Sequence, residues 1–319
     1  MLDIAADVEG RRHEKFHLLV ARAQKAPPIS IAVAHPCNEV SLESAIEAAR
    51  LKLVTPILVG PAHRIEQVAR DCRQDISGFE IVEAQHSEDS ACKAVELVRA
   101  GRAEALMKGS LHTDELMAAV VARDTGLRTA RRISHCFIMD VPGHDQPLII
   151  SDAAVNIAPT LEVKVDIVQN AIDLAHALGA QEVRVAILSA METVTPKAPS
   201  TIEAAALCKM ADRGQIVGAL LDGPLALDNA ISPAAAEVKG IVSHVAGCAN
   251  VLIVPDLEAG NMLAKSLSFL AGADAAGIVL GARVPIVLTS RADDLIARLA
   301  SCAVAVLVAA ARRLSAAIG

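Results

Sequence analysis

The sequence predicts an α/β protein with two domains, each built on a doubly wound parallel sheet. Short apolar runs rich in Val, Ile and Leu alternate with helix-length segments along most of the chain, which is the pattern of βαβ units. The 319 residues exceed what one ordinary hydrophobic core needs, so two domains are the starting expectation. A hydrophobic content of 53% indicates a globular chain.

Composition and charge argue against several kinds of partner. The formal net charge is −7, Trp and Tyr are absent, and only four Phe occur, so neither phosphate neutralisation nor base stacking is favoured. We therefore expect no nucleic-acid partner. The seven Cys are scattered without a C-x-x-C pair, which indicates free thiols in a reducing cytoplasm rather than disulfides or a zinc site.

Two segments bear on membrane targeting. The N-terminal stretch has early acidic residues and no apolar core, unlike a secretory signal. The longest apolar run, 299–311, lies between Arg298 and Arg312 and is too short to span a bilayer. We expect that run to be a buried helix and the protein to have no membrane partner.

The first half of the chain alternates between helices and strands. Residues 1–26 have the pattern of an amphipathic helix, which Pro27-Pro28 ends. The expected strands are 29–34, 56–59, 79–82 and 105–107, and the expected helices between them are 41–51, 61–72 and 89–100.

The second half continues the alternation after a break at Pro142-Gly143-His144-Asp145. The expected strands are 133–139, 147–150, 185–188, 216–221, 251–254, 276–280 and 285–288. The expected helices are 160–178, 200–213, one opened by Ser232-Pro233, one beginning near Asn261, and 295–317.

Polar and small residues follow several of these strands. Lys108 and Gly109 end one strand, where a ligand phosphate could approach the backbone, and Thr113 is a plausible N-cap for the next helix. An ordinary strand-to-helix turn with a solvated Lys gives the same pattern. Asp152 and Asn156 follow a later strand and are either ligand-binding residues or turn formers.

Two further turns lie near the end of the chain. One reads Pro255-Asp256-Leu257-Glu258-Ala259-Gly260-Asn261 and leads into a helix that carries Lys265. The other contains Ser290 and Arg291, whose guanidinium is a fork suited to phosphate. Ser290 and Asp293 also fit a helix capping box, so the second turn is equally consistent with a purely structural role.

These motifs together resemble the phosphate acetyltransferase and phosphate butyryltransferase family. The matching stretches are MKG-x-x-x-T at 107–113, D-x-x-x-N-x-x-P at 152–159, DGPL-x-x-D-x-A at 222–230, PDLEAGN at 255–261 and SR at 290–291. The resemblance runs from about residue 29 to residue 310, and the motifs fall in the right order. Several ordered motifs are far more specific than any one of them.

The resemblance implies reversible transfer of a short acyl group, acetyl or butyryl, between coenzyme A and inorganic phosphate. It also implies a fold related to the isocitrate and isopropylmalate dehydrogenases, with a ligand cleft between two domains. The expected domains are 1–145 completed by 295–319, and 146–294. A homodimer is implied, with coenzyme A as a substrate and neither a cofactor nor a metal required.

The resemblance also implies roles for individual residues. Arg291 matches the phosphate-binding Arg of the family and Ser290 its partner, while the family's Asp position holds Ala297 here. Asp294 or Asp293 is the expected base instead, with Asp294 preferred because Asp293 better fits the capping box. The expected substrate-binding residues are Lys108, Gly109, Thr113, Asp152, Asn156, Asp222, Asp228, Asn261 and Lys265.

Some features leave alternatives open. Acetyltransferases proper have Ser-Gly in place of Lys108-Gly109, so the acyl preference stays open. An NAD-dependent dehydrogenase on the same fold would need a dinucleotide fingerprint or a metal-binding Asp cluster, and neither occurs in a convincing context. A non-catalytic acyl-CoA-binding protein is also consistent with the loss of the Asp at position 297.

Overall fold

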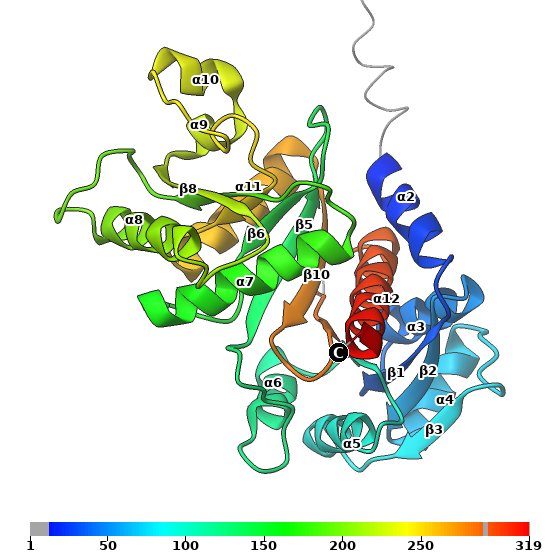
Figure 1. The fold of residues 1–319 in the computed structure, drawn as a ribbon. Coiled ribbons are helices and arrows are strands. Elements are labelled where there is room, and N and C mark those ends of the chain that lie inside the picture. The colour runs from blue at the N-terminus through cyan, green and yellow to red at the C-terminus, as the bar shows by residue number, and fades with distance from the viewer. Residues whose placement is uncertain (1–12, 290–292, 319) are drawn as a thin grey trace, which may run out of the picture. The chain divides into compact units, whose positions relative to one another are not determined.

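The computed structural model describes residues 13–289 and 293–318 (Figure 1). The chain divides into two compact units. Unit 1 comprises Met1–Lys15 and Arg132–Ala275, and unit 2 comprises Phe16–Arg131 and Ala276–Gly319.

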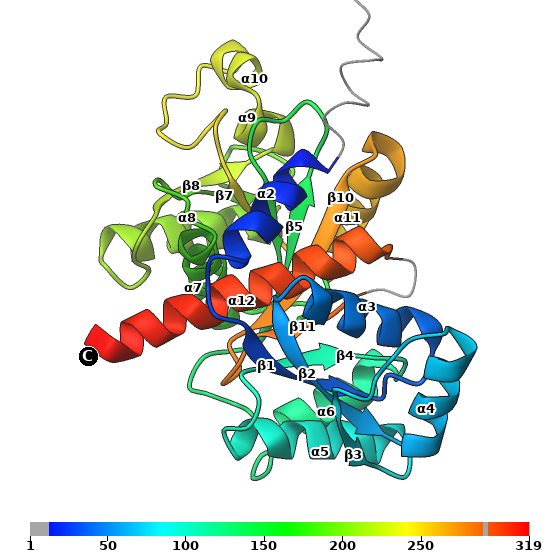
Figure 2. The ribbon, with the colours of Figure 1, turned by 90° about the vertical axis from the view of Figure 1, so that its right-hand side faces the viewer.

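Unit 2 is a twisted sheet with helices on both faces. Its strand order is β3-β2-β1-β4-β11-β10, and only the β10–β11 pair is antiparallel. The strands are β1 (Ile29–Ala34), β2 (Val54–Gly60), β3 (Glu80–Glu83), β4 (Ala105–Lys108), β10 (Asp274–Leu280), which begins in unit 1, and β11 (Ile286–Val287). The helices are α2 (Glu14–Ala23), α3 (Glu39–Arg50), α4 (Ala62–Asp71), α5 (Ser87–Arg99), α6 (Thr113–Val121) and α12 (Leu295–Ile318). Figure 2 shows α3 and α12 on one side of these strands and α5 and α6 on the other.

Unit 1 has the strand order β5-β6-β9-β7-β8, with only β5 and β6 antiparallel. Its strands are β5 (Ser134–Asp140), β6 (Leu148–Ser151), β7 (Arg184–Leu188), β8 (Leu220–Leu225) and β9 (Val251–Ile253). Its helices are α7 (Leu161–Ala177), α8 (Pro199–Asp212), α9 (Leu227–Ile231), α10 (Pro233–Val238) and α11 (Leu257–Ala271).

The core of unit 1 follows the two-residue period of its strands. Leu148 and Ile150 of β6 pack in one buried cluster with Leu252 of β9 and Ala264 of α11. The intervening residue Ile149 is also buried but lies outside that cluster, because successive side chains of a strand point to opposite faces. A strand buried on both faces needs helices on both sides, which confirms the predicted doubly wound α/β class.

Helix α12 is longer than the apolar run predicted for it. Its segment Leu295–Leu314 has the length and composition to cross a membrane, with a mean hydropathy of 1.9, but 67% of its most apolar window is buried inside the protein. The helix packs against α3 and β11. The expected run 299–311 is thus part of a longer segment that has membrane-spanning length and composition, and the expectation of a buried helix is confirmed.

Strand β8 lies about four residues later than the sequence predicts. The expected strand was 216–221, whereas the parallel ladder with β7 begins at Leu220, opposite Arg184. The Gln169 side chain accepts from the backbone N–H of Val217 at 3.0 Å and donates to its carbonyl at 3.0 Å. Because the N–H and the carbonyl of Val217 both bond to the Gln169 side chain, they do not pair with β7, and the strand begins after Val217.

The two compact units have boundaries between residues 131 and 132 and between residues 275 and 276, while the domain boundaries at 145 and 294 stay a prediction. The Pro142-Gly143 break is the turn of the antiparallel β5–β6 hairpin, where His144 N–H donates to Val141 O at 3.1 Å, so the chain stays within unit 1. Residues 276–289 belong with unit 2, where β11 pairs with β4.

Candidate active site

In unit 2 the carboxyl ends of β1 and β4 bring the Lys108–Gly109 turn against His35. The two strands pair in parallel with Ala34 opposite Lys108. Gly109 N–H donates to Ala34 O at 2.9 Å, and Ser110 N–H donates to His35 O at 2.9 Å. A Cβ atom at Gly109 would lie 2.4 Å from Ala34 O, so only glycine fits this approach of the two chains.

Lys108 is held inside this turn. Its side chain is only 6% exposed, and Nζ donates to Gly109 O at 3.5 Å. The alternative of a solvated lysine at this position is therefore wrong. A cation held at the carboxyl end of a parallel strand is suited to an anionic ligand.

We expect Gly109→Ala to destabilise unit 2 and to lower activity. The added methyl group meets backbone oxygen atoms that cannot rotate away, which is a form of overpacking that costs roughly 1–3 kcal/mol. Gly78→Ala is the matched control, because a Cβ atom there meets nothing within 4 Å. Urea denaturation measures both variants, and equal midpoints would contradict the close approach at Gly109.

Helix α6 begins one residue earlier than the sequence predicts. Its N-cap is His112 rather than Thr113, and Thr113 is the first residue of the helix. Glu115 fixes this start because its Oε2 accepts from His112 N–H at 2.7 Å. Thr113 thus lies in the first turn of α6, next in sequence to the strand-end loop that carries Lys108 and Gly109.

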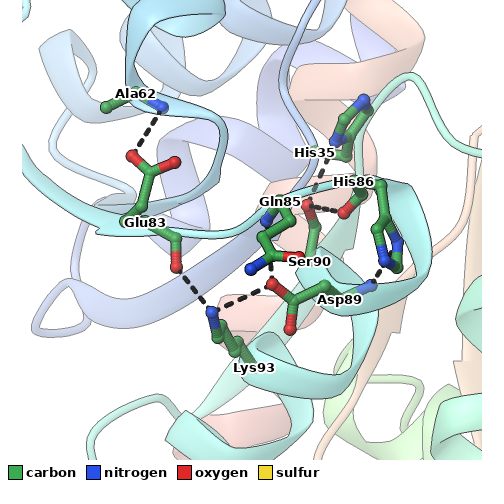
Figure 3. A network of polar contacts seen from close by, with 8 residues as sticks. All are labelled: His35, Ala62, Glu83, Gln85, His86, Asp89, Ser90 and Lys93. Atoms are coloured by element: carbon green, nitrogen blue, oxygen red, sulfur yellow. Dashed lines mark hydrogen bonds and ion pairs between the residues drawn. The ribbon is translucent and has the colours of Figure 1, made fainter.

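His35 is a buried residue at the same sheet edge that the sequence analysis did not single out. Its Nδ1 lies 3.0 Å from Ser90 Oγ, and Ser90 in turn donates to His86 O at 2.7 Å (Figure 3). Burial, with a smaller contribution from Arg64, lowers the pKa of His35 below its ordinary value. A histidine directly after a predicted strand is the signal that could have identified it.

A polar network ties the neighbouring strand ends to α5 (Figure 3). Asp89 accepts from Gln85 N–H at 2.8 Å and from Lys93 Nζ at 2.9 Å, and Lys93 also donates to Glu83 O at 2.9 Å. The Glu83 carboxylate accepts from Ala62 N–H at 3.0 Å, at the start of α4. These contacts fix the loops after β2 and β3 beside His35.

In unit 1, Asp152 organises the loop that follows β6. It is 2% exposed, and its carboxylate accepts from the backbone N–H groups of Ala154, Val155 and Asn156 at 3.0, 3.1 and 3.0 Å. Asn156 Nδ2 donates to Asp152 at 2.5 Å and to Ile133 O at 2.9 Å. The D-x-x-x-N motif therefore builds the loop, which is the turn-forming role left open by the sequence.

The PDLEAGN stretch lies against that loop. Asp256 caps α11 by accepting from Ala259 N–H at 2.9 Å, and Asn261 Nδ2 donates to Ala153 O at 3.3 Å. A Cβ atom at Gly260 would lie 2.9 Å from Asp152 O. The structure thus brings Asp152, Asn156 and Asn261 together, while Lys265 is exposed one turn further along α11.

The DGPL motif is part of a strand rather than a loop. Asp222 lies in β8, where its Oδ1 accepts from Gly223 N–H at 2.8 Å. Asp228 is exposed in the first turn of α9. The neighbouring Asn229 is fully buried, and its Nδ2 donates to Glu192, which also forms an ion pair with Lys239 at 2.8 Å.

The predicted phosphate-binding residues Ser290 and Arg291 lie outside the described residues. On one side of them, Thr289 is buried and its hydroxyl accepts from Arg298 Nη1 at 3.1 Å. On the other side, Asp293 O accepts from Arg298 Nε at 3.2 Å. The buried Arg298, which the sequence analysis treated only as the flank of an apolar run, thus holds both ends of this segment.

The preference for Asp294 over Asp293 as base rested on the wrong capping residue. Asp294 Oδ1 accepts from Ala297 N–H at 2.8 Å, so Asp294 caps α12 and Asp293 does not occupy the capping position. Ala297, which stands at the family's Asp position, is buried in the first turn of that helix. The base assignment to either Asp stays a prediction.

The cysteines, all within the described residues, form no disulfides, and three of them are buried. All seven cysteines are free thiols, and burial raises the pKa of Cys136 and of Cys302 to about 12. Within 13–289 and 293–318, no group of three His, Cys, Asp or Glu residues is arranged to hold a metal ion.

The fold and its loops define an α/β protein whose polar residues gather at the carboxyl ends of parallel strands, where such sheets bind anionic ligands. The model of the family described as "Phosphate acetyl/butaryl transferase" matches residues 83–306. The chain is 66% identical to a phosphate acetyltransferase of Rhizobium meliloti over 94% of its length and 95% of the relative's. It is 39% identical to a phosphate butyryltransferase of Clostridium beijerinckii, covering 93% and 98%.

Solved structures agree with this assignment. A branched-chain phosphotransacylase from Enterococcus faecalis V583 superimposes with a TM-score of 0.77 at 29% identity, covering 88% of this chain and 99% of that one. A 4-hydroxythreonine-4-phosphate dehydrogenase from Klebsiella pneumoniae shares the fold alone, with a TM-score of 0.52 at 12% identity over 88% and 99%. The chain belongs to the phosphate acetyl/butyryl transferase family and is an acyltransferase.

Proposed function

We propose that this protein transfers a short acyl group reversibly between coenzyme A and inorganic phosphate. The observation that carries the proposal is the 66% identity to a phosphate acetyltransferase along 94% of the chain. The buried Lys108 beside the Gly109 backbone is consistent with a site for an anionic substrate. A dehydrogenase function is not favoured, because no dinucleotide fingerprint accompanies the shared fold.

The proposed reaction is a direct transfer. In the acyl-CoA-forming direction the thiol of coenzyme A loses its proton, and the thiolate attacks the carbonyl carbon of the acyl phosphate. The carbon–oxygen bond to phosphate then breaks, and phosphate leaves with the electron pair. Positive charge that holds the phosphate also stabilises the negative charge that develops on it.

Arg291, with Ser290, is the proposed phosphate-binding residue, and Lys108 is the proposed second cation. Thr113, Asp222, Asp228 and Lys265 are proposed contacts for the remainder of the substrates on the basis of their motifs. Asp152, Asn156 and Asn261 are proposed to act by shaping the loop after β6, because their side chains bond to that loop.

Further properties are proposed from the family and from the thiols. A homodimer is the proposed assembly. The cytoplasm is the proposed location, since all seven cysteines are free thiols, as expected in a reducing compartment.

We expect full activity without metal ions or nicotinamide cofactors. The test is thiol release from acetyl-CoA and butyryl-CoA with phosphate, in excess chelator, together with thermal shift in NAD and NADP. Phosphate-dependent thiol release and no shift are the expected outcome, and the ratio of the two rates gives the acyl preference. Binding of acyl-CoA without thiol release would instead indicate a non-catalytic protein, and turnover only with NAD would indicate a dehydrogenase.

A further inference from the structure

The hydrogen bonds around His35 define which ring nitrogen carries the proton. Ser90 has one hydroxyl hydrogen, which it donates to His86 O at 2.7 Å, because a carbonyl oxygen can only accept. Ser90 Oγ must therefore accept at its other contact, with His35 Nδ1 at 3.0 Å. In the neutral imidazole, Nδ1 thus bears the hydrogen and Nε2 bears the lone pair.

That lone pair lies at the sheet edge where the substrate-binding turn begins. Within the described part of the chain, His35 Nε2 makes no hydrogen bond, and Figure 3 shows this nitrogen on the side of the ring away from Ser90. The backbone of the same residue holds the turn, because His35 O accepts from Ser110 N–H at 2.9 Å and from Ser110 Oγ at 2.8 Å. The ring is thus anchored through Nδ1, and the backbone carbonyl of the same residue holds the turn that follows Lys108 and Gly109.

We propose that His35 is the general base of the transfer and that its Nε2 accepts the thiol proton of coenzyme A. This inference rests on the proposed function. The S–H bond breaks toward Nε2, the sulfur forms its bond to the acyl carbon, and the phosphate leaves with the electrons of the C–O bond. The proton on the resulting imidazolium then passes to phosphate or to water.

The charged groups around His35 are consistent with this role. Arg64 on α4 and His86 before α5 disfavour a permanent charge on the ring, while Glu115 on α6 favours the imidazolium that forms during transfer. Burial, the largest influence, holds the pKa below its ordinary value, so the ring is neutral at pH 7 and Nε2 keeps its lone pair. The Asp294 carboxylate, in contrast, accepts the backbone N–H of Ala297 as the cap of α12, so one of its oxygens is already bonded.

The test replaces His35 by asparagine. His35 has a φ of 56°, in the left-handed region that asparagine tolerates, and an asparagine N–H can donate to Ser90 Oγ in place of Nδ1. The variant keeps that anchor and loses the Nε2 lone pair. We expect kcat for acetyl phosphate and coenzyme A to fall by roughly 10²–10⁴-fold at pH 7.5.

The pH profile separates a base from a structural residue. The wild-type rate should fall as pH drops through the pKa of His35, which lies below 6.5, because protonation removes the lone pair. His35→Asn should lack that acidic limb. His86→Asn is the control: His86 is exposed and caps α5 by accepting from Asp89 N–H at 3.3 Å, a role that asparagine fills. Its rate on the plateau should stay normal and its acidic limb should remain, shifted if at all toward higher pH, because His86 is one of the groups that lower the pKa of His35.

The outcomes separate the two proposals. A wild-type protein that makes no acetyl-CoA from acetyl phosphate would refute the proposed function itself. If the wild type is active, a folded His35→Asn variant that retains the acidic limb would overturn the role of His35. A rate for that variant within about threefold of the wild-type rate would overturn it as well. So would loss of that limb in Asp293→Asn or Asp294→Asn. If His35→Asn does not fold, ¹⁵N NMR of the wild type decides, and a hydrogen on Nε2 of the neutral ring would refute the base.

Discussion

Replacement of Arg291 by alanine should lower kcat/KM for phosphate by roughly 10²–10³-fold, about 3–4 kcal/mol of transition-state stabilisation. The motif that carries this Arg follows β11, and the described residues on both sides of it are fixed by Arg298 through Thr289 and Asp293. A cation that holds the phosphate also stabilises the negative charge that develops on it in the transition state. Arg291→Lys should recover only part of the loss, because lysine lacks the planar fork.

The control for Arg291 is Arg283→Ala, an exposed arginine in the segment between β10 and β11. Steady-state rates with varied phosphate and melting temperatures should be measured for all variants. A solvated Arg291 would instead give turnover within about threefold of normal and stability within about 0.5 kcal/mol. If a folded Arg291→Ala variant gives that result, Arg291 does not bind the phosphate during transfer.

Asp152→Asn should destabilise the protein by about 3–5 kcal/mol. The buried Asp152 carboxylate accepts four N–H groups. The side-chain amide of asparagine has only one oxygen, so its NH₂ group would face N–H donors that it cannot accept from. For a compact unit of this size the loss corresponds to a fall in melting temperature on the order of 10 °C. Urea denaturation followed by circular dichroism measures it.

The control for Asp152 is Asp256→Asn. Asp256 accepts one backbone N–H as the cap of α11, and asparagine is an equally good cap, so its stability should change by less than about 0.5 kcal/mol. If the two asparagine variants unfold at the same urea concentration, the carboxylate of Asp152 does not hold its loop.

The alternation of apolar runs predicted most of the fold because it reports burial directly. Strands β1 and β7 and helix α7 lie within one residue of the expected positions. Three errors are set by side-chain contacts to the backbone: Gln169 delays β8, Asp294 rather than Asp293 caps α12, and Asp256 caps α11, which begins at Leu257 and not near Asn261 as predicted. The Gln169–Val217 contact joins residues 48 positions apart, which local spacing does not reveal, whereas the caps are local and depend on the residue at which each helix begins.

The sequence also predicted part of the candidate site. Motifs placed Lys108, Gly109 and Asp152 at strand ends correctly, because strand ends can be read from sequence. Whether a polar side chain serves a ligand or its own loop depends on its partners, and Asp152 serves its loop. The sequence prediction did not include His35, although its place directly after a predicted strand could have suggested it, or Arg298, whose contacts with Thr289 and Asp293 no sequence motif marks.

The hydrogen bonds between the loops after β6 and β9 constrain how this enzyme can be redesigned. Val254 N–H donates to Ser151 O at 3.0 Å and Leu257 N–H donates to Ile157 O at 3.1 Å, and the Gly260 backbone crosses Asp152 O too closely for any side chain. A change made within residues 254–261 therefore acts on the loop after β6 as well. The two segments, about a hundred positions apart in the sequence, therefore form a single module for loop grafting.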